Sequence, residues 1–195
     1  MGERFEPEVH EQVPARHRLS IADFLRMAQV GILREDDRIE LIKGELIDMA
    51  PIGSKHASTV GVLTKLVILA AGEQGFVTSQ SPVVLNDDSQ PQPDLLLLKW
   101  RADYYVSALP QPGDVLLLIE VSDATLHFDR DIKIPLYAKS GIPEVWLVNL
   151  EDRTIEVYRE PSPEGYKLML RPSREDAISP IHFAGFVLTP KNLFP

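Results

Sequence analysis

A nearly unbroken apolar run at residues 116–123, Leu-Leu-Leu-Ile-Glu-Val-Ser-Asp, constrains the fold more than any other stretch of the chain. A run of this kind is typical of a strand that is covered on both faces. Glu120 lies inside it, and an ionised carboxylate there is costly unless it is paired or bound to a metal. A second apolar run, residues 95–98, follows directly after Pro93 and Asp94. The sequence thus predicts two buried strands, each with one acidic residue near an end.

Helical periodicity predicts three helices, which cover residues 20–32, 54–71 and 129–140. Ser20 and Asp23 have the spacing of a capping box at the start of the first helix. In the second helix, Leu66 and Leu69 broaden the apolar face, so we expect that helix to be well buried.

Runs rich in β-branched and other apolar residues predict the strands, which are residues 76–80, 83–85, 94–99, 115–122, 144–149, 154–159, 166–171 and 186–188. Pro82 separates the first two, which form one interrupted strand or two short strands. Lys43 and Gly44 predict a two-residue turn in a further hairpin over residues 38–49, because glycine adopts positive φ at little cost.

The order helix, three strands, helix, strand over about residues 54–150 predicts an α/β core with a mixed sheet. The three strands can form an antiparallel meander, and the later helix, over residues 129–140, can carry the crossover to the last strand. An N-terminal helix and hairpin precede this core, and a C-terminal β-hairpin follows it. Residues 1–18 are predicted to form an arm, and residues 1–195 are predicted to form a single domain, since no linker or repeat interrupts them.

The composition restricts the location and the partners of the chain. The absence of cysteine excludes disulfides and thiolate metal sites and fits a reducing cytoplasm, where we expect the protein to work. A formal charge of -9 argues against a surface built for tight non-specific DNA binding, although it permits an acidic metal site. We expect neither a signal peptide nor membrane insertion, because every apolar run is far shorter than the roughly 20 residues of a membrane helix.

Asp94 and Glu120 belong to strands that are predicted to be neighbours, and together they could share a divalent cation. Mg²⁺ suits such a pair, because it takes oxygen ligands and keeps several waters for a substrate phosphate. The alternative is a structural ion pair or, for Asp94, a turn at the end of a strand.

Several segments in the same order resemble the Uma family of restriction endonucleases, within the PD-(D/E)XK nuclease superfamily. They are residues 40–46, 54–56, 93–94, 119–122, 131–133 with Tyr137, and 141–148. The resemblance spans roughly residues 38–158 and implies the restriction-endonuclease-like fold, an αβββαβ core whose mixed β-sheet is flanked by helices. It also implies a metal-dependent endonuclease that hydrolyses phosphodiester bonds in DNA with Mg²⁺ or Mn²⁺.

The resemblance assigns Asp94 and Glu120 as metal ligands. The superfamily motif places a lysine two residues after the acid, on the same face of the strand, but Ser122 occupies that position here, which puts catalysis in question. Some members of the superfamily supply the lysine from the following helix, so Lys133 is the candidate. It would orient the attacking water or offset charge on the phosphate; the alternative is a solvated helix lysine. Asp131 is expected on a different face of that helix.

The auxiliary candidates are Glu40, His56, Gln80 and Ser122. Glu40 could instead pair with a basic neighbour in its hairpin, and His56 could be bonded locally at its helix N-terminus. Ser122 bonds a carboxylate or water, or is a plain hydroxyl at the end of a strand. The aromatic residues that we interpret as core or half-buried are Tyr137, Trp146 and Tyr158.

Two other functions stay open at this stage. One is a binding or regulatory protein that keeps the fold without cutting nucleic acid, and the other is an RNA-directed or toxin-like nuclease. For an enzyme that cuts both strands of a duplex we expect a homodimer, because two-fold symmetry matches the substrate. Either the N-terminal or the C-terminal hairpin could form the contact between subunits.

Overall fold

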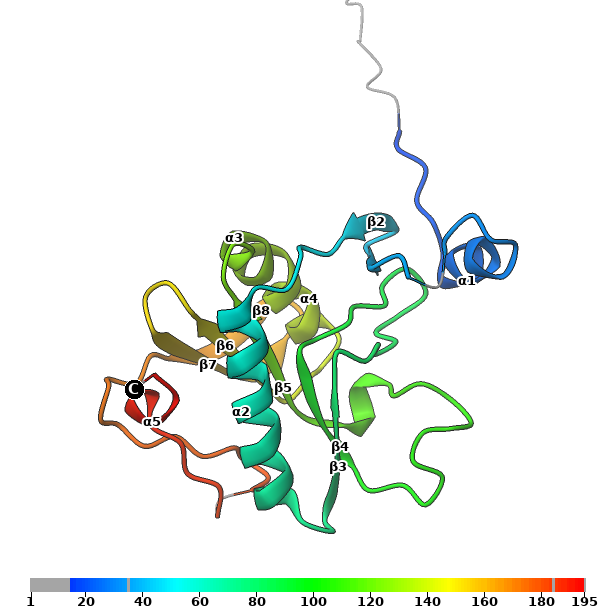
Figure 1. The fold of residues 1–195 in the computed structure, drawn as a ribbon. Helices are drawn as coiled ribbons and strands as arrows, with labels where there is room; N and C mark the ends of the chain where they lie inside the picture. Colours follow the sequence, from blue (N-terminus) through cyan, green and yellow to red (C-terminus); the bar gives the residue numbers. More distant parts are fainter. Residues whose placement is uncertain (1–14, 35, 184, 195) are drawn as a thin grey trace, which may run out of the picture.

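The structure is a computed structural model that describes residues 15–34, 36–183 and 185–194. The first fourteen residues of the predicted N-terminal arm therefore lie outside the described part. A mixed six-stranded sheet with the order β3-β4-β5-β6-β7-β8 forms the centre of the molecule (Figure 1). Its strands are β3 (Gly75–Ser79), β4 (Leu95–Lys99), β5 (Val115–Ser122), β6 (Glu144–Asn149), β7 (Thr154–Ser162) and β8 (Gly165–Leu170).

Neighbouring strands of this sheet are antiparallel, except that β5 and β6 run parallel. A crossover helix joins this parallel pair, as the sequence predicts. It consists of α3 (Leu126–Phe128), the π-helical turn η2 (Asp129–Lys133) and α4 (Ile134–Lys139). Together with α2 (Ser54–Ala71), these elements form the predicted αβββαβ core. The short 3₁₀ helix η1 (Pro112–Asp114) leads into β5.

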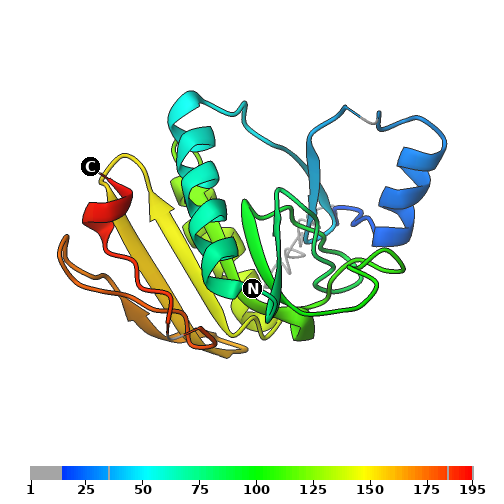
Figure 2. The same cartoon turned by 60° about the horizontal axis from the view of Figure 1, so that its bottom comes forward.

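Helices cover both faces of the sheet (Figure 2). On one face, α2 and the C-terminal segment with α5 (Pro190–Leu193) pack against an apolar cluster that includes Leu117 and Trp146. On the other face, the crossover helix packs against a second cluster that includes Leu118 and Tyr137. Every residue of β5 is buried, which explains why its sequence is apolar without alternation.

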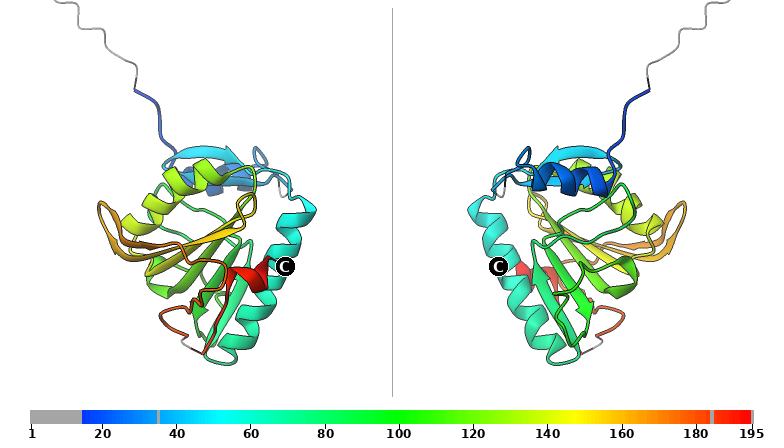
Figure 3. Two further views of the ribbon diagram at one scale, coloured as in Figure 1. Left: turned by 90° about the vertical axis from the view of Figure 1, so that its left-hand side faces the viewer. Right: turned by 90° about the vertical axis from the view of Figure 1, so that its right-hand side faces the viewer.

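The N-terminal helix and hairpin lie together at the end of the molecule where α2 begins (Figure 3). The helix α1 (Ile21–Gln29) starts with the predicted capping box between Ser20 and Asp23. The hairpin strands β1 (Ile39–Ile42) and β2 (Glu45–Asp48) join through Lys43 and Gly44, both with positive φ. The backbone of Leu19 bonds to Gly44, so the end of the predicted arm rests on this turn.

Three local predictions are wrong. Residues 83–85 form no strand, because their backbone amides bond to carbonyls of neighbouring loops. Residues 186–188 contribute only an isolated bridge between Ile178 and Leu188. Helix α2 is buried on one face only, and Leu69 on its outer face is 70% exposed. Within the described residues, no helix has the length and apolar character that a membrane span requires.

Candidate active site

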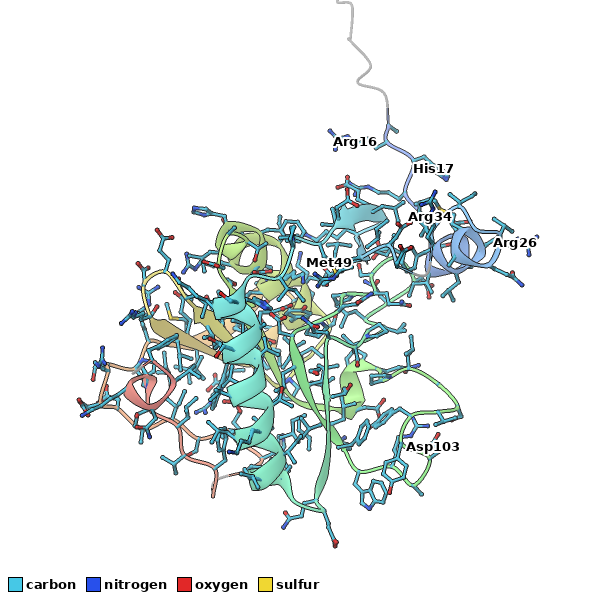
Figure 4. All side chains as sticks on the ribbon, viewed as in Figure 1. Arg16, His17, Arg26, Arg34, Met49 and Asp103 are labelled. Atoms are coloured by element: carbon cyan, nitrogen blue, oxygen red, sulfur yellow. The ribbon has the colours of Figure 1, made fainter. Side chains whose placement is uncertain are left out.

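A pocket of about 200 Å³ lies at the end of the sheet where β4 begins and β5 ends. Its walls come from the hairpin β1–β2, the start of α2, the residues just before β4, and the segment from the end of β5 into the crossover helix, so four separate parts of the chain meet there. Met49, which follows β2, lines the pocket and marks this end of the molecule in Figure 4. The predicted site residues that line it are Glu40, His56, Asp94, Glu120 and Lys133.

Asp94 lies beside Glu120 because of the register of two strands. Leu95 pairs with Ile119, which places the residue before β4 next to the end of β5. The Oδ2 atom of Asp94 accepts a hydrogen bond from the Val121 backbone amide at 2.8 Å and lies 3.1 Å from His56 Nε2. This hydrogen bond with Asp94 raises the pKa of His56, although partial burial opposes the rise. The carboxylate is thus held in place by the neighbouring strand and by the first turn of α2.

Glu120 is buried and shares Lys133 with Glu40. The Lys133 ammonium lies 2.9 Å from Glu40 Oε1 and 3.2 Å from Glu120 Oε1. Burial alone would lower the pKa of Lys133, but the charges of these two carboxylates raise it well above its usual value. The Tyr137 hydroxyl donates a further hydrogen bond of 2.5 Å to Glu120 Oε1. Burial, together with the surrounding carboxylates, raises the pKa of Glu120, and Lys133 partly offsets this rise.

Ser122 and Asp129 form a buried pair on the other side of Lys133. The Ser122 hydroxyl donates to Asp129 Oδ2 at 2.6 Å, and the Thr125 hydroxyl donates to the same oxygen at 2.6 Å. The second oxygen of Asp129 lies 4.0 Å from the Lys133 ammonium. The hydrogen bond between Ser122 and Asp129 thus ties the end of β5 to the helix that carries Lys133.

Comparison with known proteins assigns the chain to a family and shows a similar fold. A family model described as "Uma2: Putative restriction endonuclease" matches residues 21–191, which is most of the chain. The chain belongs to the Uma2 family. A comparison with curated proteins finds no match.

The fold of this Uma2 chain is similar to that of a solved structure, a "putative nuclease belonging to DUF820" from Anabaena variabilis. The two share 16% sequence identity, and the match covers 90% of this chain and 97% of that one with a TM-score of 0.73. At this identity the similarity shows the fold alone, which is the predicted restriction-endonuclease-like fold. The family assignment indicates a nuclease.

The structure separates the predicted site residues of this Uma2 chain into two groups. All five pocket residues line one cavity, in which Lys133 bonds to Glu40 and Glu120 and His56 bonds to Asp94. Ser122 lies outside this lining and bonds to Asp129. Gln80 does not join them: the chain turns with φ 49 after β3, and the exposed Gln80 side chain lines a groove along α2. Asp131, with its side chain 65% exposed, faces away from Lys133, as its helical position predicts.

Sequence reasoning missed two residues of the network, Asp129 and Tyr137. The sequence pattern assigns Asp129 no role and predicts Tyr137 as a core or half-buried aromatic, yet the Tyr137 hydroxyl bonds to Glu120. The signal that could have found them is helical spacing, because both stand four residues from Lys133 and therefore share its helix face.

The carboxylate oxygens of Asp94 and Glu120 are of the type that a divalent cation such as Mg²⁺ takes as ligands. Hydrogen bonds from the described residues reach only Asp94 Oδ2 and Glu120 Oε1, and neither remaining carboxylate oxygen is a buried atom without a partner. Within the described residues, no group of three or more His, Asp and Glu side chains could hold a metal ion. Two carboxylates suffice for Mg²⁺, which commonly completes its coordination with water and substrate phosphate.

Proposed function

We propose that this Uma2 chain is a metal-dependent nuclease that hydrolyses phosphodiester bonds in DNA. The observation that carries the proposal is the 3.2 Å contact between the Lys133 ammonium and Glu120. It brings a lysine from the crossover helix to the buried acid, in a chain where Ser122 occupies the usual lysine position. Asp94 and Glu120 would hold Mg²⁺ or Mn²⁺, which supplies charge neutralisation at the phosphate and a more acidic bound water.

Lys133 contributes as a cation and not as a base. Its raised pKa keeps the ammonium protonated at neutral pH, so it has no lone pair with which to accept a proton. A fixed positive charge beside the carboxylate pair can stabilise negative charge that develops on a phosphate or can orient the attacking water. Glu40 holds this ammonium from the hairpin, and His56 restrains the Asp94 carboxylate from α2.

Basic side chains near the pocket support a nucleic acid as the substrate. Arg38 lines the pocket itself. Arg16, His17, Arg26 and Arg34 lie around α1, at the same end of the molecule as Met49 (Figure 4). Such residues can contact phosphates locally, although the whole chain carries a formal charge of -9. This local distribution is the reason to favour an anionic polymer over a small neutral substrate.

The test is a cleavage assay on supercoiled plasmid, linear duplex DNA, single-stranded DNA and RNA, each with Mg²⁺, Mn²⁺ or EDTA. We expect DNA cleavage that requires the metal and falls at least about 100-fold in Asp94→Asn, Glu120→Gln and Lys133→Ala. Cleavage of RNA alone would replace the DNA proposal with the RNA-directed alternative. Full activity in both Asp94→Asn and Glu120→Gln would show that the proposed pair is not the active site.

Matched controls come from the same helix. Asp131→Asn and Lys139→Ala change exposed side chains of the same types, so both variants should cut at the wild-type rate. Isothermal titration with Mn²⁺ gives a second readout that does not depend on activity. Wild type and the two controls should bind Mn²⁺, whereas Asp94→Asn and Glu120→Gln should lose binding.

A second candidate function is a nucleic-acid-binding or regulatory protein without cleavage activity. Ser122 at the motif lysine position favours it, as does the commitment of Lys133 to two carboxylates. This candidate predicts that the chain binds Mn²⁺ or nucleic acid but cuts no substrate with any metal.

A further inference from the structure

Helix α2 has apolar side chains on the face that points away from the core. A surface helix in a globular protein normally exposes polar residues there, and a helix that is apolar all round is usually covered on all sides. In α2, Leu69 is 70% exposed and Ile68 is 50% exposed. Gly61 has no side chain on this outer face, and a Cβ atom added there would meet no other atom within 4 Å. The described residues therefore leave one face of α2 uncovered.

Two grooves continue this apolar face onto the edge of the sheet. One, of about 570 Å³, runs along α2 and includes Gly61 and Ile68. The other, of about 590 Å³, includes Ile68 again and reaches β3. Because they share Ile68, the grooves form one surface, which we call the α2–β3 face. Its most exposed large side chains are Ile68, Leu69, Trp100 and Tyr104.

Strand β3 adds an open edge to this face. It is the first strand of the sheet and pairs only with β4 among the described residues. An open strand edge with apolar residues around it tends to attract another chain unless something covers it. An apolar patch beside such an edge is typical of a protein–protein contact.

The charges of the α2–β3 face determine which occupant fits. Lys65 and Glu73 are the charged residues that line the two grooves, and both are exposed. Lys65 stands four residues before Leu69 within α2, and Glu73 stands four residues after it, just past the helix end at Gly72. A two-fold axis through Leu69 would bring Lys65 of one copy toward the segment that holds Glu73 of the other, twice, with apolar side chains between them. The face is complementary in charge to itself under this symmetry.

We propose that the α2–β3 face is a dimer interface that binds a second copy of this chain, with the two α2 helices antiparallel and crossing near Leu69. Isologous contacts of this kind close on themselves and give a dimer without further growth. His56 stands 13 residues before Leu69, so the two pockets would lie on the order of 40 Å apart at opposite ends of the helix pair. The dimer thus separates the two sites, and it stands whether or not the chain is a nuclease.

The first test is the oligomeric state of the full chain by sedimentation velocity between 1 and 100 μM, with concentrations chosen on the scale of weak to moderate dimers. We expect a dimer for wild type and a monomer for Leu69→Arg, since two arginines would meet at the axis and raise the Kd at least about 100-fold. Leu25→Arg is the matched control, because Leu25 is 52% exposed on α1 and should leave the dimer intact. Far-ultraviolet circular dichroism checks that each variant is folded.

Charge reversal tests the two-fold arrangement itself. Lys65→Glu and Glu73→Lys should each raise the dimer Kd about tenfold, because like charges then face one another. The double variant should restore the Kd to within about threefold of wild type, since the pairs are only exchanged. A double variant that is weaker than both single variants would overturn this pairing.

A cysteine cross-link distinguishes the α2–β3 face from a dimer contact through the N-terminal or the C-terminal elements. The chain contains no cysteine, so Leu69→Cys introduces a single thiol close to the proposed axis. Oxidation should convert most Leu69→Cys chains into disulfide-linked pairs and should leave Leu25→Cys and Met169→Cys without a cross-link. A wild-type monomer at 100 μM, as expected if residues 1–14 or another protein cover the face, would overturn the proposal. Preferential cross-linking through Leu25→Cys or Met169→Cys would overturn it in favour of the N-terminal or C-terminal contact.

Discussion

Lys133 reaches the buried acid from a helix that begins after β5 has ended. A lysine at position 122 would have stood on the strand beside Glu120, but the serine there bonds to Asp129 and restrains the helix instead. A buried ammonium is stable only when carboxylates surround it, and Glu40 and Glu120 meet that requirement. At the residue scale, the Lys133 ammonium is thus held by carboxylates, and one of them, Glu120, is also a proposed metal ligand.

The Tyr137 hydroxyl gives a test of this network through stability. Tyr137→Phe removes the 2.5 Å hydrogen bond to Glu120 and leaves the rest of the buried ring in place. Removing one partner of a buried hydrogen bond is costly, so we expect a loss of about 1–3 kcal/mol in the free energy of unfolding measured with urea. Tyr104→Phe, at an exposed tyrosine, should change it by less than about 0.5 kcal/mol. Equal results for the two variants would contradict the proposed network.

Part of the candidate site could be predicted from single residues. An acid inside an apolar run identifies Glu120, and the Pro-Asp step before a second run identifies Asp94. The roles of Asp129 and Tyr137 can be predicted only after Lys133 is placed in the pocket, because the four-residue spacing then puts both on the same helix face. Gln80 lies outside the pocket because its own backbone has a positive φ, which redirects the chain after β3.

The hairpin β1–β2 is the element that carries Glu40 into the pocket from outside the αβββαβ core. Its position depends on a close approach at Gly44, where a Cβ atom would lie 2.7 Å from the Cβ of Arg18. The turn also needs a left-handed backbone, with φ 74 at Gly44. Turn chemistry and tertiary packing thus both require glycine at the same residue.

We therefore expect Gly44→Ala to displace the hairpin. The strained φ alone should lower the free energy of unfolding by about 1–2 kcal/mol, and the clash with Arg18 should add to this. Lys43→Gly is the matched control, because φ 51 at Lys43 suits glycine and its change should stay below about 1 kcal/mol. If urea unfolding shows Gly44→Ala to be as stable as Lys43→Gly, the hairpin is not anchored in this way.

Glu156 links the C-terminal hairpin to the crossover helix. Its buried carboxylate on β7 accepts hydrogen bonds from Arg130 in η2 and from Arg171 after β8. Burial would raise the pKa of Glu156, but the hydrogen bonds from Arg130, Tyr158 and Arg171 lower it below the usual 4.5. A lowered pKa means that this carboxylate stabilises the fold above about pH 4.5 and loses that effect as the pH falls.

The expected result is a pH-dependent effect of Glu156→Gln. At pH 7 the variant should lose about 1–3 kcal/mol of unfolding free energy, because it gives up charged hydrogen bonds. The difference from wild type should shrink as the pH falls below 4.5, where the wild-type carboxylate becomes protonated. Glu160→Gln on the exposed part of β7 should match wild type at each pH. A difference that stays constant from pH 7 to pH 3 would contradict this assignment.

At the scale of the whole molecule, the order of elements is predictable because each has a strong local signal. Continuous apolar runs indicate β5 and β6, and Ser20 and Gly44 mark a helix start and a turn. The predictions fail where tertiary contacts determine the local structure or the burial. Residues 83–85 bond to loops and form no strand, and Leu69 is exposed although its helix is apolar. Hydrophobicity indicates that a side chain should be covered, but it does not indicate whether the cover comes from the same chain.

The single-domain prediction belongs to this scale and is tested by calorimetry. We expect one thermal transition whose calorimetric and van't Hoff enthalpies agree after allowance for any dimer. The hairpin β1–β2 should melt with the sheet, because Glu40 is bonded to Lys133 and to the backbone amide of Gln92. Two separate transitions would show that the N-terminal elements form a unit of their own.

Lys133 is proposed to supply the charge that the position of Ser122 lacks, and the decisive measurement is the rate of DNA cleavage by Lys133→Met at saturating Mn²⁺. Methionine keeps much of the side-chain volume and removes the charge. Because Lys133 is not a metal ligand in this account, the variant should still bind Mn²⁺ in a titration, while its cleavage rate should fall at least about 100-fold. Cleavage within about threefold of the wild-type rate, with Mn²⁺ bound, would contradict the account.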